Sequence, residues 1–139
     1  MATITLEKKY PVSREKVWTH LVNDELLSAW CMPSNGFALE KGQEFVFKID
    51  PNAFFDGTFY NKVIDFDEYN SLMYQCIAKK PVLDTTVKWI LKEQDEETTL
   101  ILEHSGFKSS DFLTKAMLKS GWKKMMNEHL HDALANSQT

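Results

Sequence analysis

The chain contains 139 residues, of which 43% are hydrophobic, 26% charged and 12% aromatic, and its formal net charge is −4. This length fits a single domain, and the negative charge excludes general nucleic-acid binding, which needs a basic surface. No apolar run approaches the ~20 residues of a membrane-spanning helix, so we expect no membrane span.

The first thirty residues predict one strand followed by two short helices. Ile4 and Leu6 alternate with polar residues, as in a half-buried strand. Ser13 is a typical N-cap for the first short helix. Asn23 or Asp24 can cap the second one, which carries leucines and a tryptophan along its length.

Five further strands follow, each with apolar residues at every second position. The predicted strands lie within residues 44–49, 57–66, 71–76, 87–92 and 99–104. Short segments rich in Pro, Asn, Asp and Gly separate several of them, and these residues favour turns and loops. Together with the first strand, they make six.

The C-terminal part of the chain predicts one long amphipathic helix. From Asp111 to about Ala135 the apolar period is nearly four residues, and at 1.5 Å per residue such a helix is roughly 37 Å long. Gly121 costs about 1 kcal/mol relative to alanine in this interior, and we interpret it as a point of close packing against another element. The expected apolar stripe contains Leu118, Trp122, Met125, Met126, His129, Leu130 and Ala133.

The predicted order of elements, β-α-α-β-β-β-β-β-α, is typical of an α+β fold. We expect a curved six-stranded antiparallel sheet wrapped around the long C-terminal helix, with the two short helices after the first strand. The apolar face of the sheet needs a cover, and the long helix can provide it. Because a strongly curved sheet around a helix often leaves its centre unfilled, we also expect a largely apolar cavity between them.

Four stretches of the sequence also carry a family resemblance, in order along the chain. They are residues 12–18 (VSREKVW), 24–30 (DELLSAW) and 98–107 (TTLILEHSGF), and the pair Gly121-Trp122 with the apolar residues after it. The chain thereby resembles the START-like, or SRPBCC, superfamily. Within it, the chain is most similar to the branch of the C-terminal domain of the activator of the ninety-kilodalton heat-shock-protein ATPase.

This resemblance implies a single helix-grip domain over residues 1–139, with a cavity that often takes apolar small molecules. It does not imply one activity, because the superfamily includes lipid carriers, hormone receptors, cyclases and co-chaperone domains. For the tryptophans and phenylalanines of the inward face, the alternative is an ordinary core position in which they fill the space. From strand parity, the helical stripe and the cavity that the resemblance implies, we expect nine residues to bind a ligand. They are Trp30, Phe45, Phe47, Tyr74, Trp89, Leu102, His104, Trp122 and Met126.

His104 is the chief polar residue of this predicted cavity, because it shares parity with Leu100 and Leu102. A histidine in this position could donate a hydrogen bond to a ligand or act as a general base. Alternatively, it is a core histidine whose ring is satisfied by a backbone carbonyl or a hydroxyl. The sequence leaves both interpretations open.

The sequence lacks the residue patterns of common catalytic and metal sites. It contains no glycine-rich phosphate loop, dinucleotide fingerprint or nucleophile elbow. Glu128 and His131 have one half of a di-iron spacing, but a second copy is missing. We therefore predict no catalytic residues, no metal and no cofactor. Cys31 and Cys76 are expected to be reduced thiols of a cytoplasmic protein.

Three functions are compatible with these observations. The leading hypothesis is a non-catalytic protein that binds an apolar or amphipathic small molecule. The second is an interaction module with a chaperone as its partner, as the family name suggests. The third is a cyclase or hydrolase that uses His104, helped by Tyr74 and Thr85. Monomer and homodimer both stay open.

Overall fold

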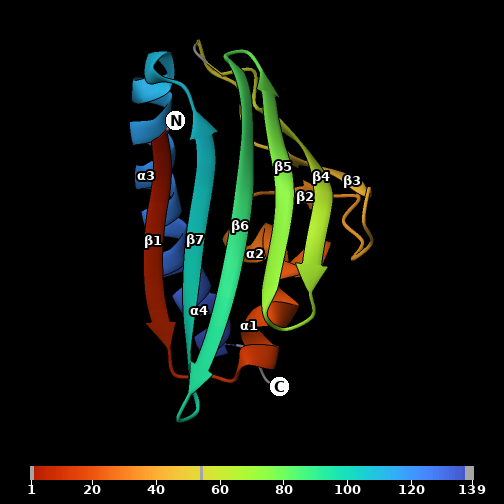
Figure 1. Cartoon of the computed structure of the whole chain (residues 1–139), viewed down its shortest axis with the longest axis vertical. Coiled ribbons are helices and arrows are strands. Elements are labelled where there is room, and N and C mark those ends of the chain that lie inside the picture. The colour runs from red at the N-terminus through yellow and green to blue at the C-terminus, as the bar shows by residue number, and fades with distance from the viewer. Residues whose placement is uncertain (1, 54, 137–139) are drawn as a thin grey trace.

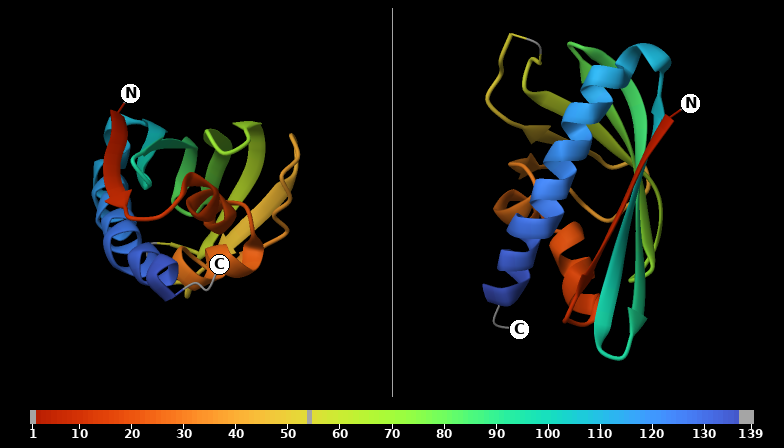
Figure 2. Two further views of the ribbon diagram at one scale, coloured as in Figure 1. Left: turned by 90° about the horizontal axis from the view of Figure 1, so that it is seen from below. Right: turned by 90° about the vertical axis from the view of Figure 1, so that its left-hand side faces the viewer.

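The computed structural model describes residues 2–53 and 55–136. One antiparallel sheet, with strand order β1-β7-β6-β5-β4-β3-β2, curves around a long C-terminal helix (Figures 1 and 2). The strands are β1 (Ala2–Tyr10), β2 (Ser34–Asn35), β3 (Glu44–Lys48), β4 (Thr58–Asp67), β5 (Ser71–Lys79), β6 (Val82–Gln94) and β7 (Glu97–Phe107). The arrangement confirms the expected α+β helix-grip architecture.

The described sheet has seven strands where the sequence predicted six. The additional strand is β2, whose two residues pair with Phe47 and Val46 of β3. Alternation of polar and apolar residues cannot reveal a two-residue strand, because it needs several positions to show. The sequence predicts an irregular segment here, because Pro33 and Gly36 flank the two residues.

Two short helices, α1 (Arg14–Leu21) and α2 (Asp24–Trp30), connect β1 to β2. The Ser13 hydroxyl accepts a hydrogen bond from the Lys16 backbone N–H, which confirms Ser13 as the N-cap of α1. For α2 the cap is Asn23, whose side chain accepts from the Leu26 backbone N–H. The indole of Trp30 donates to the carbonyl of His20 at 2.8 Å and so ties the two helices together.

The C-terminal helix has the expected extent but is not α-helical throughout. A short 3₁₀ turn at Ser109–Asp111 leads into α3 (Phe112–Lys124), then a π-helical turn (Met125–Leu130) and finally α4 (His131–Asn136). Its fully buried residues are spaced by four: Trp122, Met126, Leu130 and Leu134. In a regular α-helix, residues four apart drift around the axis by about 40° per step. The wider π turn reduces this drift.

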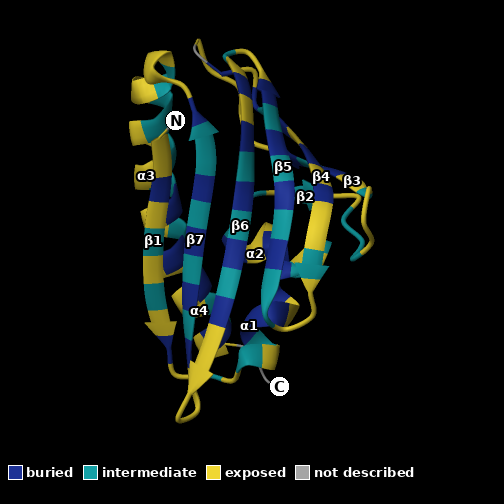
Figure 3. Cartoon of the chain, in the orientation of Figure 1, coloured by how far each residue is buried: buried dark blue, intermediate teal, exposed yellow. Residues whose placement is uncertain are grey.

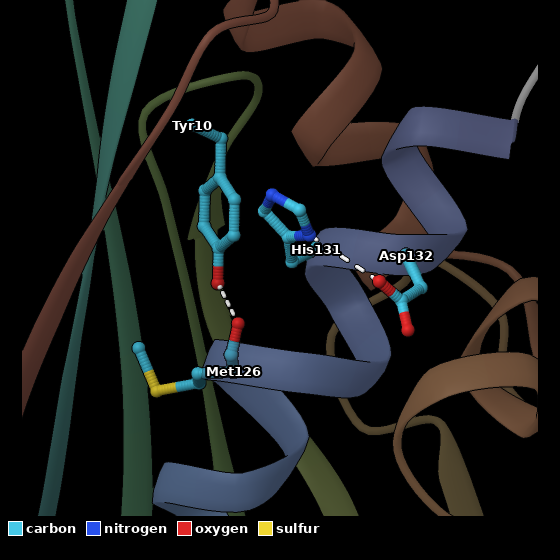
Figure 4. A network of polar contacts seen from close by, with 4 residues as sticks. All are labelled: Tyr10, Met126, His131 and Asp132. Carbon is cyan, nitrogen blue, oxygen red and sulfur yellow. Dashed lines mark hydrogen bonds and ion pairs between the residues drawn. The ribbon is translucent and has the colours of Figure 1, made fainter.

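The π turn explains one wrong expectation of the sequence analysis. His129 was placed on the apolar stripe, but it is exposed in the structure. The hydroxyl of Tyr10 donates to the carbonyl oxygen of Met126 at 2.7 Å and so connects the end of β1 to this turn (Figure 4). On the outside, the imidazole of His131 lies 3.3 Å from the carboxylate of Asp132 (Figure 4).

The buried residues follow the strand alternation that the sequence predicted. Along β5 and β6, buried side chains alternate with half-buried or exposed ones, as the banding in Figure 3 shows. The buried set faces the helices. The short helices lie toward the end of the sheet that carries the β6–β7 turn, whereas α3 begins at the end that carries the β5–β6 turn (Figures 1 and 2).

Candidate functional site

A cavity of about 300 Å³ lies between the concave face of the sheet and α3. Every strand from β3 to β7 contributes to its wall, and so do the β3–β4 loop and the inner face of the helix. Its wall is predominantly apolar and includes Met32, Phe47, Phe55, Phe59, Tyr74, Cys76, Ala78, Leu83, Val87, His104, Met117, Leu118, Gly121, Trp122 and Met125.

The exposed wall residues mark where this cavity meets solvent. Ile49, after β3, is 41% exposed, and Met117 of α3 is 51% exposed. The polar residues Asn52 and Lys124 also line the cavity and are exposed. The opening therefore lies between the β3–β4 loop and α3.

His104 is held in a chain of hydrogen bonds that fixes its protonation. The indole N–H of Trp122 donates to His104 Nδ1 at 3.0 Å, so Nδ1 carries no proton. The proton is on Nε2, which donates to the hydroxyl of Thr85 at 2.8 Å. The hydroxyl in turn donates to the carbonyl of Cys76. Burial lowers the pKa of His104 from 6.5 to about 4, because the charged form is poorly solvated.

This geometry agrees with the core-histidine alternative for His104. The ring lies on the cavity wall, but both nitrogens are already engaged, one of them as the acceptor for Trp122. A general base needs a free nitrogen within reach of a substrate proton. His104 would have to give up the Trp122 bond to provide one.

Tyr74 is the other polar residue of the inner wall. Its hydroxyl oxygen accepts a hydrogen bond from the indole N–H of Trp89 at 3.2 Å. Its ring meets Phe45 and Phe47 edge-on, with centroids 5.1 and 6.4 Å away. Burial raises the pKa of Tyr74 well above its usual value of 10, so the hydroxyl keeps its proton.

The two thiols are not activated. Burial raises the pKa of Cys76 to about 12 and also raises that of Cys31. Both therefore remain protonated at neutral pH, and a protonated thiol is a poor nucleophile and metal ligand. Among residues 2–53 and 55–136, no group of three or more His, Cys, Asp or Glu is placed to hold a metal ion.

Four of the nine predicted ligand-binding residues lie on the cavity wall: Phe47, Tyr74, His104 and Trp122. The other five do not line it and are buried in the core instead. They are Trp30, Phe45, Trp89, Leu102 and Met126.

The indole rings explain part of this division. Trp89 lies between two other tryptophans, with ring centroids 5.9 Å from Trp30 and 5.4 Å from Trp122. These edge-to-face contacts fill the space under the short helices. Strand parity identified the correct face of the sheet, but it could not tell which positions along that face are covered by α2.

Sequence reasoning also missed part of the wall. Phe59, Leu83 and Val87 have inward parity and could have been found from it, whereas Phe55 lies in a loop that shows no pattern. Gly121 was interpreted as a point of close packing, and this is wrong. A Cβ atom added to Gly121 would meet no heavy atom within 4 Å, because the residue faces the cavity.

One buried polar side chain near the cavity has no partner. Asn61 of β4 is 3% exposed, and neither its amide nitrogen nor its carbonyl oxygen has a hydrogen-bond partner among the described residues. It shares the concave face with Phe59 and pairs with Cys76 across the β4–β5 ladder.

No described helix is both long enough and apolar enough to cross a membrane.

The sequence model of the family described as "Activator of Hsp90 ATPase homolog 1-like protein" matches residues 11–135. No curated protein matches the chain.

Solved structures with the same architecture cover almost the whole chain. Protein MLL2253 from Mesorhizobium loti is 23% identical with a TM-score of 0.88, over 99% of this chain and 100% of that one. The Aha1 dimer from Colwellia psychrerythraea is 20% identical with a TM-score of 0.76, over 100% of both chains. BH1534 from Bacillus halodurans is 23% identical with a TM-score of 0.78, over 96% of this chain and 97% of that one. At these identities the likeness concerns the fold alone.

Proposed function

The chain belongs to the Activator of Hsp90 ATPase homolog 1-like family, and from this premise we propose that it binds an apolar or amphipathic small molecule in its cavity without acting on it chemically. The observation that carries the proposal is the composition of the wall. Most of its side chains are aromatic, aliphatic or sulfur-containing, and its inner polar groups bond to one another.

The volume of the cavity sets the size of the ligand. An apolar cavity of about 150 Å³ stays dry and binds benzene. The cavity described above is about 300 Å³, so it accommodates a molecule of two or three fused rings or a short acyl chain. Each apolar Å² that such a ligand removes from water contributes about 25 cal/mol.

Catalysis has less support from this geometry. A cyclase or hydrolase needs an acid or base that can reach the substrate. In the described part of the wall, both nitrogens of His104 are engaged and the Thr85 hydroxyl already donates to a carbonyl. We therefore propose binding in preference to turnover.

Native mass spectrometry tests the proposal directly. The protein is mixed with a panel of short-chain lipids and aromatic polyketides, and we expect one-to-one adducts with a subset of them. Trp122 lines the cavity, so the same ligands should change tryptophan fluorescence. The matched control is Gly121→Phe, whose ring would occupy the cavity and abolish both signals. If wild type formed no adduct with any member of the panel and its tryptophan fluorescence did not change, the proposal would be contradicted.

A second candidate function is an interaction with a heat-shock ATPase, which the description of the family favours. The Aha1 structure from Colwellia psychrerythraea is a dimer, so the active form under this alternative would be a homodimer. The two functions are separated by the steady-state ATPase rate of the chaperone with and without the protein. Under the small-molecule proposal that rate does not change.

A further inference from the structure

The cavity runs along β5 and β6 from the β5–β6 turn toward the centre of the sheet. Ala78 pairs with Leu83 next to the turn, and Tyr74 pairs with Val87 four residues further in; all four residues line the cavity. Four residues of a strand span about 13 Å. Tyr74 thus lies at the inner end of the cavity, and a ligand that enters from solvent brings one of its ends to this residue.

At the inner end, the indole and imidazole hydrogens have acceptors among the described residues, but one hydroxyl hydrogen does not. The indole hydrogens of Trp89 and Trp122 go to Tyr74 and His104, and the hydrogen on His104 Nε2 goes to Thr85. A tyrosine hydroxyl can donate one hydrogen bond as well as accept. The hydroxyl of Tyr74 accepts from Trp89, but its own hydrogen has no acceptor among the described residues.

This unused donor is deeply buried, because Tyr74 is only 2% exposed. A buried donor without an acceptor is unfavourable, and buried polar groups in native proteins are nearly always paired. The unpartnered amide of Asn61 lies opposite Cys76, two positions along β5 from Tyr74. Two neighbouring parts of the sheet are thus short of hydrogen-bond partners.

We infer that the ligand carries a neutral hydrogen-bond acceptor, such as a carbonyl or ether oxygen, at the end that enters first, and that the Tyr74 hydroxyl donates to it. This inference rests on the proposed small-molecule function. Tyr74 is then the residue that determines specificity, and the class of ligand narrows to neutral ketones, quinones, esters or ethers with an apolar body.

The acceptor is neutral because of what surrounds Tyr74. Among the described residues, its ring and hydrogen-bond neighbours are Phe45, Phe47 and Trp89, none of which carries a charge. Burying a carboxylate without a cationic partner is strongly unfavourable. Lys124 lines the cavity but is exposed. A fatty acid would therefore not place its ionised end beside Tyr74.

The test uses two bicyclic probes of the same size that differ by one carbonyl, tetralin and 1-tetralone. Their dissociation constants are measured for wild type and for Tyr74→Phe, and the ratio of tetralin to 1-tetralone gives the preference for the carbonyl. A neutral hydrogen bond corresponds to a ~3- to 10-fold change in affinity. We expect Tyr74→Phe to reduce the preference by that factor, through weaker binding of 1-tetralone.

Trp89→Phe is the matched control, because it removes a neighbouring aromatic donor but leaves the Tyr74 hydroxyl in place. It should keep the preference for 1-tetralone. If the preference is the same in wild type and in folded Tyr74→Phe, the inference is overturned while the proposed function stands. If neither probe nor any member of the wider panel binds wild type, the proposed function fails and the inference fails with it.

An infrared measurement on wild type keeps the test decisive should Tyr74→Phe not fold. The carbonyl stretch of bound 1-tetralone should move to a lower frequency than in an alkane solvent, because a hydrogen bond weakens the C=O bond. A stretch at the alkane frequency would overturn the inference without any substitution.

Discussion

The two ring nitrogens of His104 have opposite roles, and this asymmetry makes the residue sensitive to protonation. The indole N–H of Trp122 can only donate, so His104 Nδ1 must accept. A proton on Nδ1 would place two donors against each other at 3.0 Å. It would also put a positive charge into a buried site that is only 1% exposed. Both effects favour the neutral ring.

Stability should therefore fall as the pH is lowered from neutral toward 4. The pKa of His104 is about 4 in the folded protein and about 6.5 when unfolded. Between these values the unfolded chain binds a proton that the folded one does not, so the free energy of unfolding rises with pH. The difference amounts to about 3 kcal/mol at 1.36 kcal/mol per pKa unit.

Urea unfolding of wild type and His104→Gln at several pH values between 7 and 4 measures this effect. The substitution removes the titrating ring, so the pH dependence of the variant reports the remaining titratable groups. We expect wild type to lose about 3 kcal/mol more than the variant over this range. Parallel curves for the two proteins would contradict the prediction.

At the scale of single elements, two glycines show how differently a missing side chain can be used. Gly121 is an interior residue of α3 that faces the cavity, and an added Cβ would touch nothing within 4 Å. Gly57 precedes β4 with φ +91°, and an added Cβ would lie 2.4 Å from the carbonyl oxygen of Ile49. The loop before β4 requires a glycine at this position, whereas the helix does not.

Alanine substitutions at these glycines should therefore have opposite effects. Gly121→Ala should raise the free energy of unfolding by about 1 kcal/mol, the difference in helix propensity. Gly57→Ala should lower it by more than ~1 kcal/mol, because the backbone conformation is strained and the Cβ clashes. Urea unfolding of both variants provides the measurement. A destabilised Gly121→Ala would mean that another element packs closely on α3.

At the scale of the whole molecule, the fold was largely predictable, but the cavity wall was predictable only in part. Alternation placed Tyr74 and Trp89 on the same face correctly, since side-chain direction is a local property of a strand. Tyr74 lines the cavity and Trp89 is covered, because α2 places Trp30 over Trp89. That contact joins residues 59 positions apart, so no local pattern contains it. His129 was misplaced because its position on the stripe assumed regular α-helical geometry, whereas the helix contains a π turn at Met125–Leu130.

The cavity is a property of the assembled sheet and helix, since five strands and α3 contribute to its wall. A ligand held there binds the folded protein and not the unfolded chain. It must then stabilise the molecule as a whole, by about 2.7 kcal/mol at a ligand concentration 100 times the dissociation constant. For a chain of this length, the melting temperature should rise by roughly 10 °C.

Thermal unfolding with a ligand identified by mass spectrometry measures this coupling, at several ligand concentrations. At ligand concentrations above the dissociation constant, the rise in melting temperature should follow the logarithm of the ligand concentration. It should be absent in Gly121→Phe, in which the cavity is occupied, and present in Ala116→Phe, which adds the same ring at an exposed position of α3. A ligand that forms an adduct and raises the melting temperature of Gly121→Phe as much as that of wild type would bind outside the cavity. That outcome would separate adduct formation from the function proposed for the cavity.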